Sequence, residues 1–175
     1  RLKQWIALLQ PRTIPERLQL SVSVPPWGDV EKDEAGHSIN LAEEKAKALA
    51  EECARDFQSW ISHLPLVLQG EQRQAFAFGL RLGQCLKDIQ PFITSALRGL
   101  AAIDRREANP TVLGAFLQGI QDRDPQQVEQ TLESVAEDPL CCFYIADLTR
   151  LIITMLSDLE RILRVVRTRC LPVTA

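Results

Sequence analysis

Three pairs of a short polar residue followed by proline divide the second half of the chain: Asn109 with Pro110, Asp124 with Pro125, and Asp138 with Pro139. A short polar side chain can accept hydrogen bonds from the free amides of a first helical turn, and proline is tolerated at the first helical position. Each pair therefore predicts the start of a new helix. Pairs only about fifteen residues apart leave room for short helices.

Apolar residues between these starts recur at the spacing of one helix face. Behind Asn40, a predicted N-cap with Glu43 three positions later, the expected buried face is Leu41, Ala42, Ala46, Leu49, Ala50 and Cys53. The same spacing predicts helices over residues 2–9, 57–64, 71–88, 92–103 and 110–121, and beyond Asp124, Asp138 and Ser157. The last of these has an apolar face of Leu159, Ile162, Leu163 and Val166, flanked by Arg161, Arg164 and Arg167. With 46% hydrophobic and only 6% aromatic residues, the chain is expected to be all-α, with about eight helices.

The region before residue 40 has a different pattern. Residues 17–24 alternate apolar and polar side chains, which predicts a short extended connector. Residues 25–40 are rich in proline, glycine and acid, and predict a surface loop. We expect an N-terminal part of residues 1–39, with a helix, the connector and an acidic loop, and a helical-repeat domain of residues 40–175. Together they are expected to form one compact unit, a fragment of a longer protein.

Two similar stretches lie forty residues apart, "AFAFGL" at 75–80 and "AFLQGI" at 115–120. A period of about forty residues is typical of HEAT-like helix pairs, which stack to cover their apolar faces. In that interpretation Phe76 and Phe116 are equivalent packing anchors, while Gly79 and Gly119 allow close approach of helices. Truncating either ring to alanine is then expected to cost about 3–5 kcal/mol. Chance recurrence of a short apolar pattern is the alternative.

The segment 29–56 concentrates nine acidic against four basic residues. Its loop, which follows an aromatic residue that could anchor a partner, is the candidate protein-binding site: Trp27, Asp29, Glu31, Asp33, Glu34 and His37. A solvated acidic face, with Trp27 packed against Trp5, is the alternative interpretation.

Residues suited to catalysis are sparse. His37 and His63 lie in a loop and near a helix end, and Cys141 and Cys142 have no histidine nearby in sequence. No GxSxG, HExxH or glycine-rich phosphate loop occurs. We therefore expect no catalytic residue, no metal and no cofactor.

The charge and cysteine content bear on partners and location. A net charge of −3 gives no overall attraction for nucleic acid or anionic membranes, so neither is an expected partner. Five cysteines without a CxxC pair fit a reducing cytoplasm. No long apolar run or signal peptide is recognised. A cytoplasmic protein with a protein partner is the prediction.

Four segments carry a resemblance to known proteins: "IPERLQLSVSVPPW", "INLAEEKAKALAEE", "GEQRQAFAFGLRLG" and "NPTVLGAFLQGIQDRDPQQVEQTLESVAEDPL". Over residues 15–170 the chain resembles the helical-repeat tails of large bacterial signal-transduction ATPases used in antiviral defence. The resemblance implies a sensor or scaffold module without catalysis of its own, and it carries over no functional residue. Two alternatives remain open: a stand-alone immunity or regulator protein that neutralises a partner through its acidic loop, and a cysteine- or metal-dependent hydrolase built from His37 or His63.

Overall fold

The computed structural model describes residues 13–23, 30–32, 38–152 and 156–170. The prediction that the chain is all-α is confirmed for this part, which is mostly helical and carries one small two-stranded sheet. The helices are α2 (Ile14–Leu18), α3 (Leu41–Arg55), α4 (Phe57–Trp60), α5 (Ala75–Cys85), α6 (Gln90–Ala102), α7 (Thr111–Ile120), α8 (Pro125–Glu137), α9 (Ile145–Leu151) and α10 (Leu156–Val165). Wider or tighter helical turns continue the chain at η1 (Gln19–Ser23), η2 (Ile61–Val67), η3 (Cys142–Tyr144) and η4 (Val166–Cys170). The helix expected over residues 2–9 lies outside the described residues.

The predicted N-caps bond as expected at three helix starts. The Oδ1 atom of Asn40 accepts hydrogen bonds from the amides of Ala42 and Glu43, at 3.1 and 3.3 Å. Asp124 accepts from the amide of Gln127 at 3.0 Å, and Asn109 from that of Thr111 at 3.0 Å. These bonds satisfy amides that have no partner within the helix, so the helices begin within two residues of the expected positions.

The helix expected directly behind Asp138 is delayed. Asp138 accepts hydrogen bonds from the amides of Leu140 and Cys141, and these close a turn rather than opening a helix. A 3-10 turn follows, and α9 begins only at Ile145. The local side-chain bonds of aspartate compete with helix formation here, and the boundary prediction is wrong by several residues.

The extended connector expected over residues 17–24 is wrong, because the described part of it is helical. The side chain of Thr13 caps α2 in a capping box with Glu16, and η1 continues the helix to Ser23. Leu18 and Val22 are fully buried while Leu20 is 47% exposed. Alternation over so short a stretch also contains the four-residue spacing of a helix, and the cap decides between the two.

The loop expected over residues 25–40 contains a small hairpin. Strands β1 (Val30–Lys32) and β2 (Ser38–Asn40) pair antiparallel, with Val30 opposite Asn40. The strands are largely exposed and end at the N-cap of α3.

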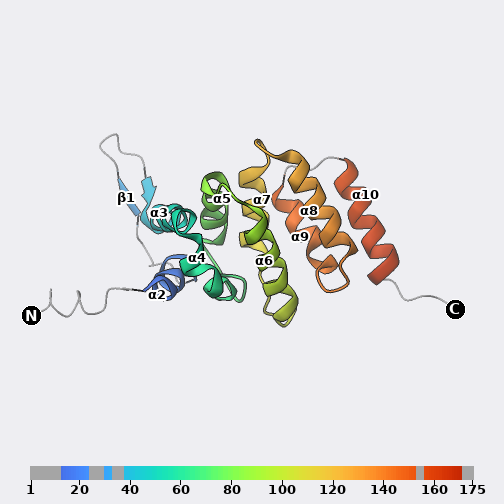
Figure 1. Cartoon of the computed structure of the whole chain (residues 1–175), viewed down its shortest axis with the longest axis horizontal. Helices are drawn as coiled ribbons and strands as arrows, with labels where there is room; N and C mark the ends of the chain where they lie inside the picture. Colours follow the sequence, from blue (N-terminus) through green and yellow to red (C-terminus); the bar gives the residue numbers. More distant parts are fainter. Residues whose placement is uncertain (1–12, 24–29, 33–37, 153–155, 171–175) are drawn as a thin grey trace, which may run out of the picture.

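The helices follow one another along the long axis of the molecule in sequence order (Figure 1). Alternate helices contact each other, α3 with α5, α5 with α7, and α7 with α9. The intervening elements lie beside them, and η2 contacts α6 while α8 contacts α10. Figure 1 shows α2, α3 and the hairpin at one end of the molecule and α10 at the other.

Four aromatic rings from successive elements join at the centre of the core. Trp60 lies edge-on to Phe78, with ring centroids 5.8 Å apart, and 6.3 Å from Phe92. Phe92 in turn lies 4.2 Å from Phe116. The indole of Trp60 donates a hydrogen bond to the carbonyl of Cys53 at 2.9 Å, so its one polar atom is satisfied. The rings therefore tie α4, α5, α6 and α7 into one core.

Glycines set the contact between α5 and α7. A Cβ atom at Gly79 would overlap the carbonyl oxygen of Val112, and one at Gly119 would overlap that of Leu80. Phe116 is fully buried, but Phe76 is 39% exposed. The expectation that Phe76 is a buried anchor equivalent to Phe116 is therefore wrong. The ring of α5 that reaches the core is Phe78.

Ion pairs hold α10 against α8. The guanidinium of Arg161 is buried and pairs with Glu129 and, at 3.1 Å, with Glu133. Arg164 pairs with the other oxygen of Glu133 at 2.5 Å. Of the expected inward face of this helix, Ile162 is partly buried against the core, and the side chain of Leu159 lies outside the described residues. The expectation is wrong for Leu163 and Val166, which are exposed, while Val165 is buried.

The pairing of Glu133 predicts a pH dependence of stability. Burial by itself would raise the pKa of Glu133, but hydrogen bonds from Arg164 and Arg161 outweigh it and the pKa lies below its ordinary value of 4.5. A carboxyl whose pKa is lowered in the folded state contributes stability above its unfolded pKa, and that contribution is lost as pH falls through the folded pKa. We expect Glu133→Gln to melt lower than the wild type near neutral pH, with the gap closing below about pH 4. Thermal melts of both proteins across pH 3–8 test this, and a gap that widens in acid would contradict it.

Candidate functional site

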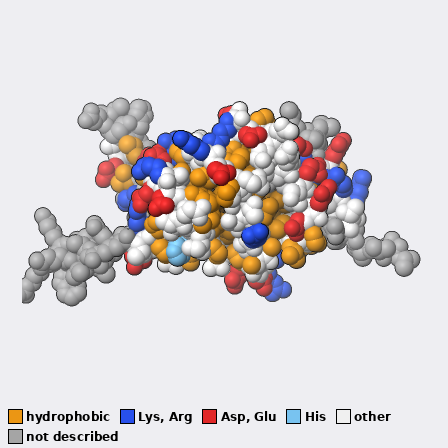
Figure 2. Space-filling model, in the orientation of Figure 1, with side chains coloured by type: hydrophobic (Ala, Val, Ile, Leu, Met, Phe, Trp, Pro, Cys, Tyr) orange, Lys and Arg blue, Asp and Glu red, His pale blue; other side chains and the backbone are white. Residues whose placement is uncertain are grey.

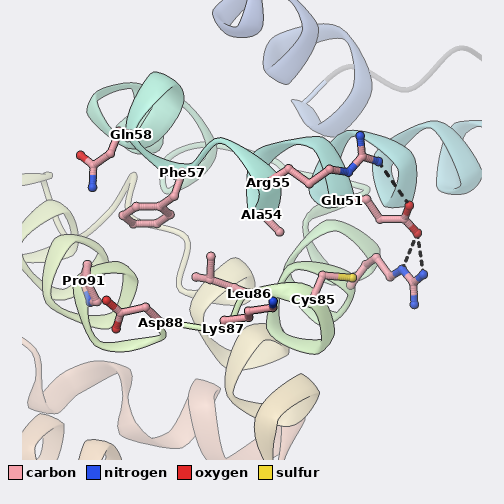
Figure 3. A pocket seen from close by; sticks show the side chains of 11 residues that line it. Glu51, Ala54, Arg55, Phe57, Gln58, Cys85, Leu86, Lys87, Asp88 and Pro91 are labelled. Carbon is pink, nitrogen blue, oxygen red and sulfur yellow. Dashed lines mark hydrogen bonds and ion pairs between the residues drawn. The ribbon is translucent and has the colours of Figure 1, made fainter.

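A half-open cavity of about 650 Å³ lies where α3 gives way to α4, opposite the turn between α5 and α6 (Figure 3). We name it the helix-end cavity. Its lining residues are Glu51, Ala54, Arg55, Phe57, Gln58, Arg81, Cys85, Leu86, Lys87, Asp88 and Pro91.

Two breaks in the helices create this cavity. At Asp56 the backbone leaves the helical region, with φ −126° and ψ 69°, and α4 starts in a new direction. On the facing side α5 ends at Cys85, and Leu86 is extended, with φ −71° and ψ 125°. Pro91 then lies in the first turn of α6. Helix ends separated by about thirty residues in sequence thus leave an unfilled corner between them.

One side of the cavity carries two apolar rings, together with the polar side chains of Gln58 and Asp88 (Figure 3). Figure 3 shows Phe57 and Pro91 on this side, with Leu86 at the centre. Leu86 is buried, and the ring of Phe57 packs edge-on against Trp60 with centroids 6.0 Å apart. Because Phe57 rests on the aromatic core, this wall is preorganised for an apolar group.

The other side carries charge. Glu51 accepts hydrogen bonds from Arg81, from Nε at 2.8 Å and Nη2 at 2.5 Å, and lies 3.8 Å from Arg55 (Figure 3). The hydrogen bond to Glu51 raises the pKa of the Arg81 guanidinium. Lys87 is exposed on the turn before α6, and Asp88, also exposed, lies on the side of Pro91 (Figure 3). Three cations and two carboxylates therefore leave one net positive charge on the lining.

The cysteine thiols of the described residues differ in how far they are buried. Cys85 is half-buried in the cavity wall. Burial raises the pKa of Cys53 to about 12 and that of Cys141 to about 11. Both of these thiols stay protonated near neutral pH, which makes them poor nucleophiles.

Most residues of the predicted partner site lie in segments that the structure does not describe. Glu31 is exposed on β1, while Trp27, Asp29, Asp33, Glu34 and His37 lie outside the described residues. That loop therefore stays a prediction. His63 is half-buried on η2, and within the described ranges no group of three or more metal-ligating side chains forms. In the same ranges, no helix has the length and apolar character needed to cross a bilayer.

The helix-end cavity was not predicted from the sequence. In the sequence, Phe57 fits the apolar face of a helix, and Lys87 with Asp88 fits an ordinary charged turn. The one available signal is the break of the helical pattern between Leu86 and Pro91, next to side chains of mixed character.

Comparison of the chain with models of protein families, with curated proteins and with solved structures gives no match.

Proposed function

We propose that this chain is a protein-interaction module, a HEAT-like α-solenoid whose stacked helix pairs bind a segment of a partner protein in the helix-end cavity. The supporting observation is that the cavity combines a rigid apolar wall with a positively charged rim at the joint between two successive helix pairs. A sensor or scaffold role within a longer bacterial protein belongs to the same proposal.

The order of contacts supports the stacked arrangement. The odd-numbered helices from α3 to α9 contact each other in series, and α3, α7 and α9 each also contact the helix that follows them in the chain. In such arrays each pair contacts mainly its neighbours, and binding surfaces form along the joints. The cavity lies at one of these joints, between α3–α4 and α5–α6.

The lining defines the class of partner. A cavity wall of Phe57, Leu86 and Pro91 suits an apolar side chain, and the net positive rim suits a nearby carboxylate. A short peptide segment with a leucine- or phenylalanine-like residue beside Asp or Glu meets both requirements. The paired charges of Glu51 and Arg81 then orient the segment rather than supply most of its affinity.

Selection from a displayed library of random peptides tests this function. We expect enriched peptides to share an apolar residue next to an acidic one. Lys87→Glu should weaken their binding at least fivefold by reversing a rim charge, and Ala54→Trp should abolish it by filling the cavity.

Lys32→Glu is the matched control, because it makes the same charge change on the exposed strand β1 outside the cavity. It should leave peptide affinity within twofold of wild type. Enrichment without a shared pattern, or equal losses in Lys32→Glu and Lys87→Glu, would contradict the assignment of the cavity.

A further inference from the structure

Helix α10 packs a mixed side inward, where Ile162 is partly buried against the core beside a buried arginine. Arg161 is only 2% exposed and faces α8, where it pairs with Glu129 and Glu133. Val165, one turn later, is buried on the same side. Amphipathic helices normally turn their apolar stripe toward the core. Here the inward side also carries the ion pairs of Arg161, and part of the apolar stripe is left outside.

Two apolar residues near the end of α10, on the side away from Arg161, face solvent. At 3.6 residues per turn, Leu163 lies about half a turn from Arg161, and it is 50% exposed. Val166, three residues on, is 39% exposed. In the sequence, leucines at 156 and 159 precede them with the same alternating spacing of three and four. This is the a/d spacing of a coiled-coil seam.

We propose that this seam packs against α10 of a second copy of the chain, in an antiparallel pair related by a two-fold axis. Leu163 of each copy then lies beside Val166 of the other. Figure 1 shows α10 at the end of the molecule, away from the hairpin and α3.

The charged residues beside the seam favour a second copy of the chain as the partner, and they favour an antiparallel orientation of the two helices. Glu160 and Arg167 are exposed and lie on the same edge of the stripe, seven residues or about 10 Å apart along the axis. An antiparallel two-fold brings Glu160 of each copy level with Arg167 of the other, which gives two complementary pairs. In a parallel pair, equal residue numbers lie level, so these two charges do not meet.

The size of the contact sets the expected affinity. One short helix from each copy buries an area at the low end of specific interfaces, below about 1,200 Å² in total. A two-fold contact also closes on itself and does not extend into fibres. We therefore expect a weak, concentration-dependent dimer.

Sedimentation velocity of the full chain over a wide concentration range tests the proposal. The wild type should shift from one chain mass to two, and Leu163→Asp should remain at one, with a melting temperature close to wild type. The matched control is Leu20→Asp, since Leu20 is 47% exposed on η1. This segment follows α2, which lies at the other end of the molecule (Figure 1). The control variant should dimerise like the wild type.

Charge reversal tests the direction of the pair. Glu160→Arg alone and Arg167→Glu alone should each weaken the dimer at least fivefold, because like charges then meet. The double variant should recover it, as should an equal mixture of the two single variants. Recovery in neither case would overturn the antiparallel pairing.

A chain that stays monomeric at every concentration, or one whose dimer survives Leu163→Asp but not Leu20→Asp, would overturn the proposal as a whole. The outcome is separable from that of the proposed function. The helix-end cavity is lined by residues of α3 to α6 and the turns between them, so Leu163→Asp should leave peptide binding unchanged.

Discussion

Replacing Phe116 with alanine is expected to lower the free energy of unfolding by about 3–5 kcal/mol. The side chain is fully buried, and its ring lies 4.2 Å from that of Phe92. Its backbone carbonyl already touches α5 at Gly83, so the helices cannot move closer to fill the space left by the ring. Urea denaturation followed by circular dichroism measures the loss.

Phe76→Ala provides the matched comparison, since the same atoms are removed from a ring that is 39% exposed. We expect it to cost less than half as much as Phe116→Ala, because less apolar surface returns to water and little cavity remains. Equal losses would show that the two rings are equivalent after all, as the forty-residue repeat predicts.

Local signals gave two of the helix starts correctly. Asn40 and Asp124 cap their helices through bonds to amides two or three residues ahead, and such bonds depend only on neighbours in the sequence. The buried positions of α3 follow for a similar reason. Ala46, Leu49, Ala50 and Cys53 are spaced for one face, and that face is buried.

Two further errors, in α10 and in α5, arose where distant residues decide. The stripe of α10 is visible in the sequence, but its direction depends on Arg161 meeting Glu129 and Glu133, about thirty residues away. Phe76 and Phe78 both fit an apolar helix, and only the close approach of α7 at Gly79 and Gly83 determines which ring is buried.

The candidate site shows the same limit. Its walls come from residues 51–58 and 81–91, which no motif connects. These two segments lie next to each other because of how α3 and α5 pack and where each helix ends. Composition predicted a helical protein, but the corner between the helix ends is a property of the packing.

Gly83→Ala is expected to destabilise the protein by about 1–3 kcal/mol, although alanine favours a helix over glycine by about 1 kcal/mol. A Cβ atom at this position would overlap the carbonyl oxygen of Phe116 and lie 3.1 Å from the Cα of Gly119. Both obstacles are backbone atoms, so relief requires that α5 and α7 separate along their whole contact. The same urea titration measures the change.

Gly99→Ala in α6 is the matched control, because there the added Cβ would meet only the Cδ1 atom of Leu68, at 2.8 Å. The end of a leucine side chain can rotate away, so the gain in helix propensity offsets the crowding and the variant should lie within about 0.5 kcal/mol of wild type. If Gly83→Ala is as stable as Gly99→Ala, α5 and α7 are not held at backbone contact. If it is less stable by the expected margin, glycine at position 83 is required by the closeness of the two helices and by nothing in the conformation of α5 itself, where alanine is the better residue.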